Sequence, residues 1–196
     1  MYQALLADAR FHHLLLHCDR DLAAAARAKR CAVCGGRLDS SPFRRKPRGR
    51  LVACDEAHDW RFSLCCAMGE CRKRITPASL RFLGRKVYLG AVVVLVTAML
   101  HGLTETRLHR LRDLVGVSRR TVARWRVWWL ATFTAGRFWT VASAAVMPPA
   151  DPSRLPASLL ERFAGGLEDR LLALLRFLGP ITGGEDRQAV ALKHAF

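Results

Sequence analysis

The sequence contains few acidic residues and only two tyrosines, and none of its hydrophobic runs reaches the length of a membrane-spanning helix. Its 16 Asp and Glu residues stand against 32 Lys and Arg residues, so the formal net charge is +16 and the isoelectric point is about 10.9. This balance predicts a polyanionic partner. Residues 77–146 hold eleven basic and two acidic groups, the largest local excess in the chain. A GC-rich genome would also favour arginine, and this alternative stays open on composition alone.

Neither a signal peptide nor a membrane-spanning helix is predicted. Asp and His residues interrupt the leucines of residues 1–30, whereas a signal peptide has a continuous apolar core. The most apolar run, residues 87–100, is 14 residues long, and a helix that crosses a bilayer needs about 20. We therefore expect a cytoplasmic protein without membrane contact. Residues 87–100 would form a buried helix, and residues 1–30 an N-terminal helical segment whose second helix starts at Asp19 or Asp21.

Groups that could carry out catalysis are also scarce. A two-metal nuclease needs converging carboxylates on a sheet-based scaffold, and residues 77–146 offer only Glu105 and Asp113. Tyr2 and Tyr88 are the only candidates for a tyrosine nucleophile, and no Gly-rich phosphate-binding loop is present. We therefore expect a binding protein rather than an enzyme, with a truncated recombinase or nuclease as the less favoured alternative.

The seven cysteines form the most informative pattern outside the charged segments. Their number is odd and no export signal accompanies them, so a disulfide framework is not expected. Two residues separate Cys31 from Cys34, which lets both sulfurs reach one ion, and the two following glycines permit a tight turn. Cys66 and Cys71 would supply two further thiolates after a short strand at residues 60–64. The sequence thus predicts one structural Zn2+ held by four thiolates.

The second pair of ligands leaves alternatives open. Cys65 directly precedes Cys66 and competes with it as a ligand, and His58 is a minor candidate. Cys18 and Cys54 lie outside the pattern, and we expect them to be small buried hydrophobic side chains.

Basic residues flank the predicted zinc site. A proline-interrupted loop at residues 40–51 and the segment after Cys71 would form a cationic extension that suits contact with a DNA backbone or minor groove. A solvated linker would have the same composition. The candidate DNA-binding residues of this region are Arg44, Arg45, Lys46, Arg48, Arg50, Arg72, Lys73 and Arg74.

Residues 111–126 have the pattern of a helix-turn-helix. Apolar residues precede Gly116, which permits the turn, and Ser118 can cap the helix that follows. That helix offers hydrogen-bond donors near its N-terminus, where recognition helices meet the major groove of DNA. The candidate DNA-binding residues are Ser118, Arg119, Arg120, Thr121, Arg124 and Arg126.

The remainder of this domain is expected to be helical. Residues 87–100 would be its first helix, Thr104 or Thr106 would start the second, and the third would run from Ser118 to Thr132 or beyond. Tryptophans of the third helix recur near the helical period, which favours the core over base stacking. They are Trp125, Trp128 and Trp129.

The C-terminal quarter is neutral in net charge and rich in leucine. Its prolines predict a linker at residues 147–156, and a leucine stripe over residues 159–175 predicts helices. These helices would pack on the helical domain or form an interface with a second copy or a partner protein. Residues 183–196 are expected to be a loose tail.

Together these patterns predict a mainly α protein with a small zinc ribbon. The expected segments are an N-terminal helical segment at residues 1–30 and a zinc ribbon of β-hairpins at residues 31–76. A three-helix helix-turn-helix DNA-binding domain at residues 77–146 and the linker, C-terminal helices and tail at residues 147–196 would follow.

The order of these motifs, over about residues 31–130, resembles the N-terminal DNA-binding portion of insertion-sequence transposases and their short companion proteins. The resemblance implies zinc at Cys31, Cys34, Cys66 and Cys71, and recognition of an element's terminal repeats in double-stranded DNA on the bacterial nucleoid. Two departures are plain: the second cysteine pair is spaced more widely than usual, and no catalytic domain follows. We therefore expect an accessory or end-binding protein of a mobile element. A transcriptional regulator built from the same two modules is the alternative.

Overall fold

The fold is taken from a computed structural model that describes residues 2–45, 47–84, 86, 88–99, 106, 109 and 113–183. The α-helices are α1 (Tyr2–Ala7), α2 (Ala9–Ala28), α3 (Gly90–Ala98), α5 (Arg119–Val127), α6 (Arg137–Ala142), α7 (Ala157–Leu160) and α8 (Leu167–Phe177). The strands are β1 (Leu38–Ser40), β2 (Phe43–Arg44), β3 (Trp60–Arg61), β4 (Leu64–Cys66) and β5 (Arg74–Ile75). A π-helix at Trp128–Phe133 continues α5, and 3-10 helices lie at Glu56–Asp59, Ser143–Ala145, Pro152–Arg154 and Gly179–Ile181.

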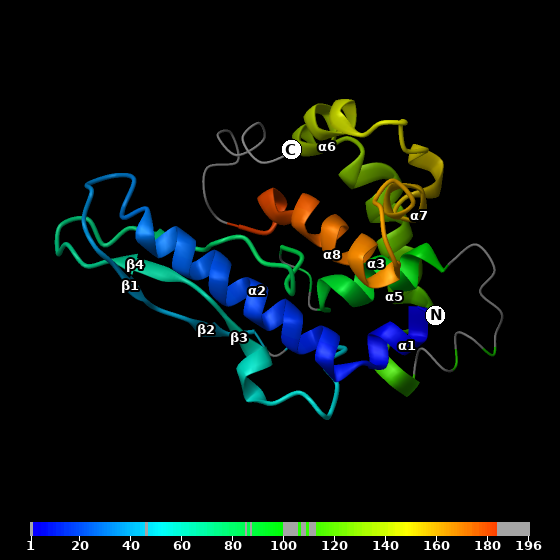
Figure 1. The fold of residues 1–196 in the computed structure, drawn as a ribbon, viewed down its shortest axis with the longest axis horizontal. Coiled ribbons are helices and arrows are strands. Elements are labelled where there is room, and N and C mark those ends of the chain that lie inside the picture. The colour runs from blue at the N-terminus through cyan, green and yellow to red at the C-terminus, as the bar shows by residue number, and fades with distance from the viewer. Residues whose placement is uncertain are drawn as a thin grey trace.

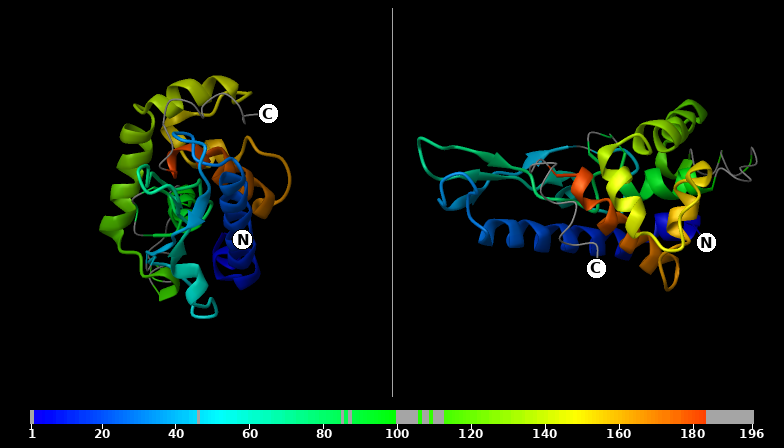
Figure 2. Two further views of the ribbon diagram at one scale, coloured as in Figure 1. Left: turned by 90° about the vertical axis from the view of Figure 1, so that its left-hand side faces the viewer. Right: turned by 90° about the horizontal axis from the view of Figure 1, so that it is seen from above.

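The molecule is elongated, with most helices at one end and the strands towards the other (Figure 1). The long helix α2 joins the two ends and runs beside the strands, as the turned views also show (Figure 2). Two groups of buried side chains correspond to these ends. The larger lies among the helices, and the smaller consists of Cys31, Leu38, Leu64, Cys66 and Ile75. The prediction of a mainly α chain with small antiparallel sheets is confirmed.

The break between the two N-terminal helices lies at Asp8, earlier in the sequence than expected. The carboxylate of Asp8 accepts a hydrogen bond from the backbone N–H of Arg10 and so caps α2. From there α2 runs unbroken to Ala28. The prediction of a second helix starting at Asp19 or Asp21 is therefore wrong, because Asp19 is a buried residue in the middle of α2.

The strands form two small sheets. One has the order β1-β4-β5, with Leu38 opposite Cys66 and Leu64 opposite Ile75, and the other pairs β2 with β3. The expected continuous strand at residues 60–64 is instead divided between the two sheets. In the three-stranded sheet, side chains alternate between faces, so Leu64 and Cys66 are buried while Cys65 lies on the outer face.

Helix α3 is the centre of the larger core. All nine of its residues are buried, as expected for a helix that is apolar on every side. It contacts α1, α5 and α8, so residues from the first, third and fourth expected segments share one core. None of the described helices combines the length and the apolar composition that a membrane crossing requires.

The tryptophans and the C-terminal leucines also enter this core. Trp125 and Trp129 are buried, which confirms their predicted place, and the half-buried Trp128 is covered by the ammonium group of Lys86 at 3.9 Å from its ring centre. The leucines of the C-terminal stripe that are buried within the chain are Leu159, Leu160, Leu171, Leu174 and Leu175. Most of the stripe is therefore used in packing inside the chain.

Several sequence-based expectations fall outside the described residues. These are the contact made by Lys46, a helix start at Thr104, the carboxylate of Glu105 and the tail from residue 184 onwards. Thr106 is helical, as are residues 113–115 immediately before the turn.

A buried ion pair fastens α2 to the rest of the fold. Asp19 and Arg81 are 1% and 2% exposed, and Nε of Arg81 lies 2.8 Å from a carboxylate oxygen of Asp19. The same carboxylate accepts hydrogen bonds from the Ser79 hydroxyl at 2.5 Å and from the backbone N–H of Leu80 at 2.6 Å. Both carboxylate oxygens are thus satisfied in the interior, as a buried charge requires.

Arg81 extends this network towards the strands. Its two terminal nitrogens donate to the backbone carbonyls of His58 and Trp60 at 3.0 and 2.8 Å. Nearby, the buried Arg61 donates to the carbonyls of Pro77 and Thr182, and burial lowers the pKa of its guanidinium to about 10. Arg81 therefore links α2 to the segment around β3, and Arg61 in β3 links this segment to Thr182 near the C-terminal end of the described residues.

We predict that Asp19→Asn lowers the free energy of unfolding by about 3 kcal/mol or more, because it leaves the charge of Arg81 buried without its partner. Urea unfolding followed by circular dichroism measures this change. Asp21→Asn is the matched control, since Asp21 is exposed on the same helix, and it should change stability by less than about 0.5 kcal/mol. Equal effects of the two substitutions would contradict the assigned role of the ion pair.

Candidate metal centre and arginine-bearing helix

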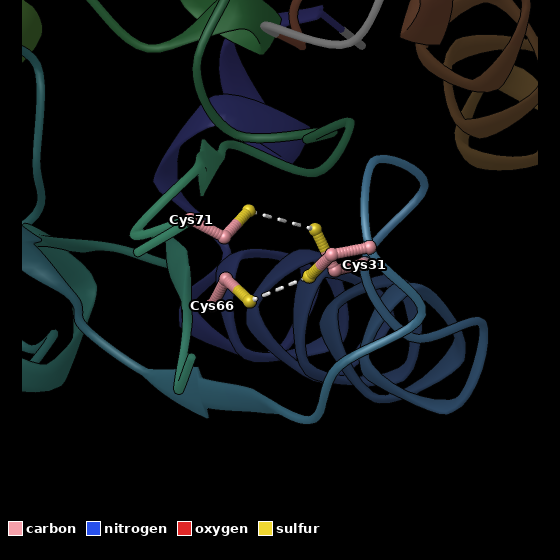
Figure 3. Close-up of side chains that lie close together, drawn as sticks. Cys31, Cys66 and Cys71 are labelled. Carbon is pink, nitrogen blue, oxygen red and sulfur yellow. Dashed lines mark hydrogen bonds between the residues drawn. The ribbon is translucent and has the colours of Figure 1, made fainter. Parts of the chain in front are cut away.

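Four cysteine side chains converge at the strand end of the molecule. The sulfur atoms of Cys31, Cys34, Cys66 and Cys71 all lie within 4.8 Å of one another. The Sγ atoms of Cys31 and Cys71 are 3.7 Å apart, and those of Cys34 and Cys66 are 3.4 Å apart. Figure 3 shows the sulfurs of the labelled cysteines directed towards a common centre. The predicted set of four ligands is therefore brought together by the fold, and Cys66, not Cys65, belongs to it.

The first cysteine pair is positioned by a tight turn after α2. The backbone N–H of Gly35 donates to the carbonyl of Cys31 at 2.8 Å, and the N–H of Cys31 donates to the carbonyl of Gly36 at 2.9 Å. Gly35 has a φ of +69°, which favours glycine. A Cβ at Gly36 would lie 2.5 Å from Cγ of Met68, so a side chain there would collide with the second pair's loop.

The second pair reaches the cluster despite its wider spacing. Cys66 ends β4, and the chain then turns so that the N–H groups of Cys71 and Arg72 both donate to the carbonyl of Met68. The N–H of Cys66 donates to the carbonyl of Lys73 at 2.9 Å, which brings the two ends of this loop together. The four residues between the cysteines are therefore accommodated within one compact turn.

This donor set fits zinc. Tetrahedral Zn–S bonds of about 2.3 Å place sulfurs about 3.8 Å apart, which is close to the two sulfur–sulfur separations in the cluster. Two backbone N–H groups, those of Cys34 and Val33, lower the pKa of the Cys31 thiol to about 7, and an ionised sulfur is the form that binds metal. Four protein ligands would leave no position open for water, so the site is suited to a structural ion.

The remaining candidate ligands lie outside the cluster. The thiol of Cys65 faces the carbonyl of Arg72 at 3.6 Å on the outer face of the sheet. His58 is buried, and its Nδ1 lies 2.8 Å from a carboxylate oxygen of Asp55, which lowers the pKa of that carboxyl. Cys54 is buried as expected and burial raises the pKa of its thiol, whereas Cys18 is half-buried.

We predict that the purified protein holds one zinc ion per chain and that Cys34→Ser abolishes this zinc and unfolds the surrounding turn, since metal binding and local folding are coupled. Metal analysis and circular dichroism measure the two effects. The control is Cys65→Ser, which alters a neighbouring thiol outside the cluster and should leave one zinc bound. A folded wild-type protein without zinc would refute the site.

Helix α5 begins with the cap that the sequence predicts. The hydroxyl of Ser118 accepts a hydrogen bond from the backbone N–H of Thr121 at 3.3 Å. Gly116, two residues earlier, has a φ of +66°, and its carbonyl accepts a hydrogen bond from the hydroxyl of Tyr88 at 2.9 Å. The turn before α5 is therefore fixed to the segment that leads into α3.

The two faces of α5 differ sharply. Thr121, Val122 and Trp125 are buried. The exposed residues are Arg119, Arg120, Ala123, Arg124, Arg126 and Val127. At about 100° per residue, these exposed positions form one continuous arc of roughly 160°. The candidate DNA-binding residue Thr121 is buried, not presented on the surface, and its hydroxyl lies 3.0 Å from that of Ser118.

Three arginines of the 40–51 loop, Arg44, Arg45 and Arg50, are engaged within the protein, contrary to the expected cationic extension. Arg44 pairs with Glu56 and Asp59, and Arg50 pairs with Asp59 at 3.0 Å. Arg45 donates to the backbone carbonyls of Gly84 and Lys86. The physical reason is the pairing of β2 with β3, which holds this loop against acidic groups that sequence spacing does not reveal.

The other basic candidates remain on the surface. Arg48 is exposed, with its guanidinium 6.0 Å from the ring centre of Tyr88. Arg72, Lys73 and Arg74 are exposed beside the second cysteine pair. Arg48 therefore lies near the turn before α5, whereas Arg72, Lys73 and Arg74 lie at the end of the molecule that holds the cysteine cluster.

No protein-family model, curated protein or solved structure matches this chain. The function must therefore be inferred from the geometry of the two sites themselves.

Proposed function

We propose that this chain is a sequence-specific binding protein for double-stranded DNA and that α5 enters the major groove. The observation that carries this proposal is the exposed arc of α5, which bears four arginines while its opposite face is anchored in the core. Guanidinium groups donate in pairs to guanine edges and to phosphates. A recognition helix needs this combination of donors and rigid support.

The electrostatics of α5 support the same function. Arg120 and Arg126 form no ion pair with any described residue, and Arg124 has one weak hydrogen bond, to the hydroxyl of Thr121 at 3.4 Å. These donors are therefore available to an external acceptor. Ser118 and Arg119 at the start of the helix would contact the DNA backbone, and Arg48 beside the preceding turn could add a phosphate contact.

In this proposal the metal centre has a structural role and the protein has no catalytic core of its own. A zinc ion would hold the turns that carry the exposed Arg72, Lys73 and Arg74 in one arrangement. Binding to the ends of a mobile element, as an accessory or transposase-like protein, is the role that the order of motifs favours. Regulation of transcription requires the same contacts and is the second candidate.

We predict that Arg120→Ala and Arg124→Ala each weaken binding to the preferred DNA site by about 1–3 kcal/mol and relax the base preference at one position. The preferred site is first selected from random duplexes, and affinities are then measured by fluorescence anisotropy. Arg10→Ala at the exposed start of α2 removes the same charge from a residue outside the exposed arc of α5 and should leave base preference unchanged. Unaltered specificity in both α5 variants would refute the proposal.

The selected sequence also separates the two roles. Recovery of inverted repeats that flank the gene would support end binding of a mobile element. Recovery of a promoter sequence would support the regulator instead.

A further inference from the structure

A shallow, open groove lined by three arginines lies on the surface at the end of α2 that is remote from α5. Its volume is about 370 Å3, and it is lined by Ala24, Arg27, Ala28, Arg30 and Arg37. The two alanines are four residues apart and therefore share one face of α2. The arginines come from the last turn of α2, the residue before Cys31, and the residue before β1.

The first cysteine turn is what brings these arginines together. The hydrogen bond from the N–H of Cys31 to the carbonyl of Gly36 closes the turn, so the residues on either side of it, Arg30 and Arg37, are brought close in space. Arg27 is held beside them because its Nε donates to the carbonyl of Leu38 at 3.0 Å. The three guanidiniums are thus gathered by the backbone of the metal centre.

Most of the donors of these arginines are left for an external acceptor. Arg27 uses Nε, and Arg30 uses one terminal nitrogen on the carbonyl of Gly35 at 3.3 Å. Nε of Arg37 lies 3.1 Å from the carboxylate of Asp39, but the two side chains are 73% and 45% exposed, and such a surface pair is weak. Their other guanidinium nitrogens make no hydrogen bond to a described residue, and each guanidinium has five N–H donors.

The backbone conformation of Arg30 is also unusual. Arg30 has a φ of +59° just after α2, a position where glycine is the usual residue. An arginine there carries a conformational cost that glycine would avoid. Its guanidinium offsets part of this cost by donating a hydrogen bond to the carbonyl of Gly35 at 3.3 Å.

We propose that this groove binds backbone phosphates of double-stranded DNA as a second contact site, separate from α5. Three full positive charges exceed the roughly half negative charge at the C-terminus of a helix together with the one carboxylate of Asp39. Planar guanidiniums match phosphate oxygens in pairs. The long axis of the molecule separates this end of α2 from α5 (Figure 1, Figure 2), so the two sites cannot contact the same phosphates.

This inference rests on the proposed DNA-binding function, and its test keeps the two sites apart. The full-length, zinc-loaded chain is titrated with a random-sequence duplex longer than the footprint of one helix, between about 50 and 200 mM KCl. Four variants are compared with wild type: R30Q/R37Q in the groove, R120Q/R124Q on α5, the combination of both, and R10Q/R154Q as a control of equal charge. Zinc content and circular dichroism confirm that each is folded.

R30Q/R37Q should reduce the slope of log affinity against log salt concentration by about two, one for each phosphate that the variant no longer neutralises. The same reduction should occur in the R120Q/R124Q background, and R10Q/R154Q should leave the slope at the wild-type value. An unchanged slope in R30Q/R37Q, or an equal reduction in the control, would overturn the groove site. Failure of the α5 proposal is recognised separately, because it would leave R120Q/R124Q indistinguishable from wild type.

Vesicles containing phosphatidylglycerol provide a second arm, since a lipid headgroup also offers a phosphate. If R30Q/R37Q weakens binding to these vesicles while its binding to the duplex stays at the wild-type level, the DNA-phosphate assignment is wrong. Weaker duplex binding without any change in vesicle binding supports it.

Discussion

The buried pair of Asp19 and Arg81 is the interaction on which the arrangement of this protein depends. Apolar packing is non-directional, so it does not by itself determine how the long helix α2 is placed along the strands. The carboxylate of Asp19, with partners on both oxygens, and the guanidinium of Arg81, with carbonyls of His58 and Trp60, fix one register. Desolvation makes any other register costly, because either charge would be left buried without a partner.

That register has consequences at both ends of the molecule. At one end, α3 is buried on all sides and supports α5, so the arginine arc is presented on a rigid base. At the other end, α2 delivers Cys31 to the remaining three cysteines and sets the arginine-lined groove beside them. One helix therefore connects a basic surface supported by helices to a basic surface beside the cysteine cluster, although the two ends share no core.

Local features were predictable from the sequence, whereas only one long-range pairing was. The Ser118 cap depends on neighbours within one turn, and the burial of residues 90–98 follows from their apolar composition; the structure confirms both. The two cysteine pairs lie 32 to 40 residues apart, and their convergence was predictable because four thiols suit one metal ion. The partner of Asp19 lies 62 residues away, and no local pattern identifies it. A signal was present nonetheless, because Asp19 follows Leu15 and Leu16 on the apolar face of α2, where an unpaired carboxylate would be costly. Likewise, the sequence did not reveal the acidic partners of Arg44 and Arg50. These partners, Glu56 and Asp59, come from a separate turn that β-strand pairing brings against the loop.

In the proposed function, α5 reads bases from the major groove. Methylation interference on the selected duplex tests it most directly, because methylation of guanine N7 blocks the major-groove edge of that base. If α5 reads bases, N7 methylation at one or two guanines prevents binding by the wild-type protein, and Arg120→Ala or Arg124→Ala removes the effect at one of them. Interference confined to adenine N3 in the minor groove, or unchanged by both substitutions, would show that α5 does not read the major groove.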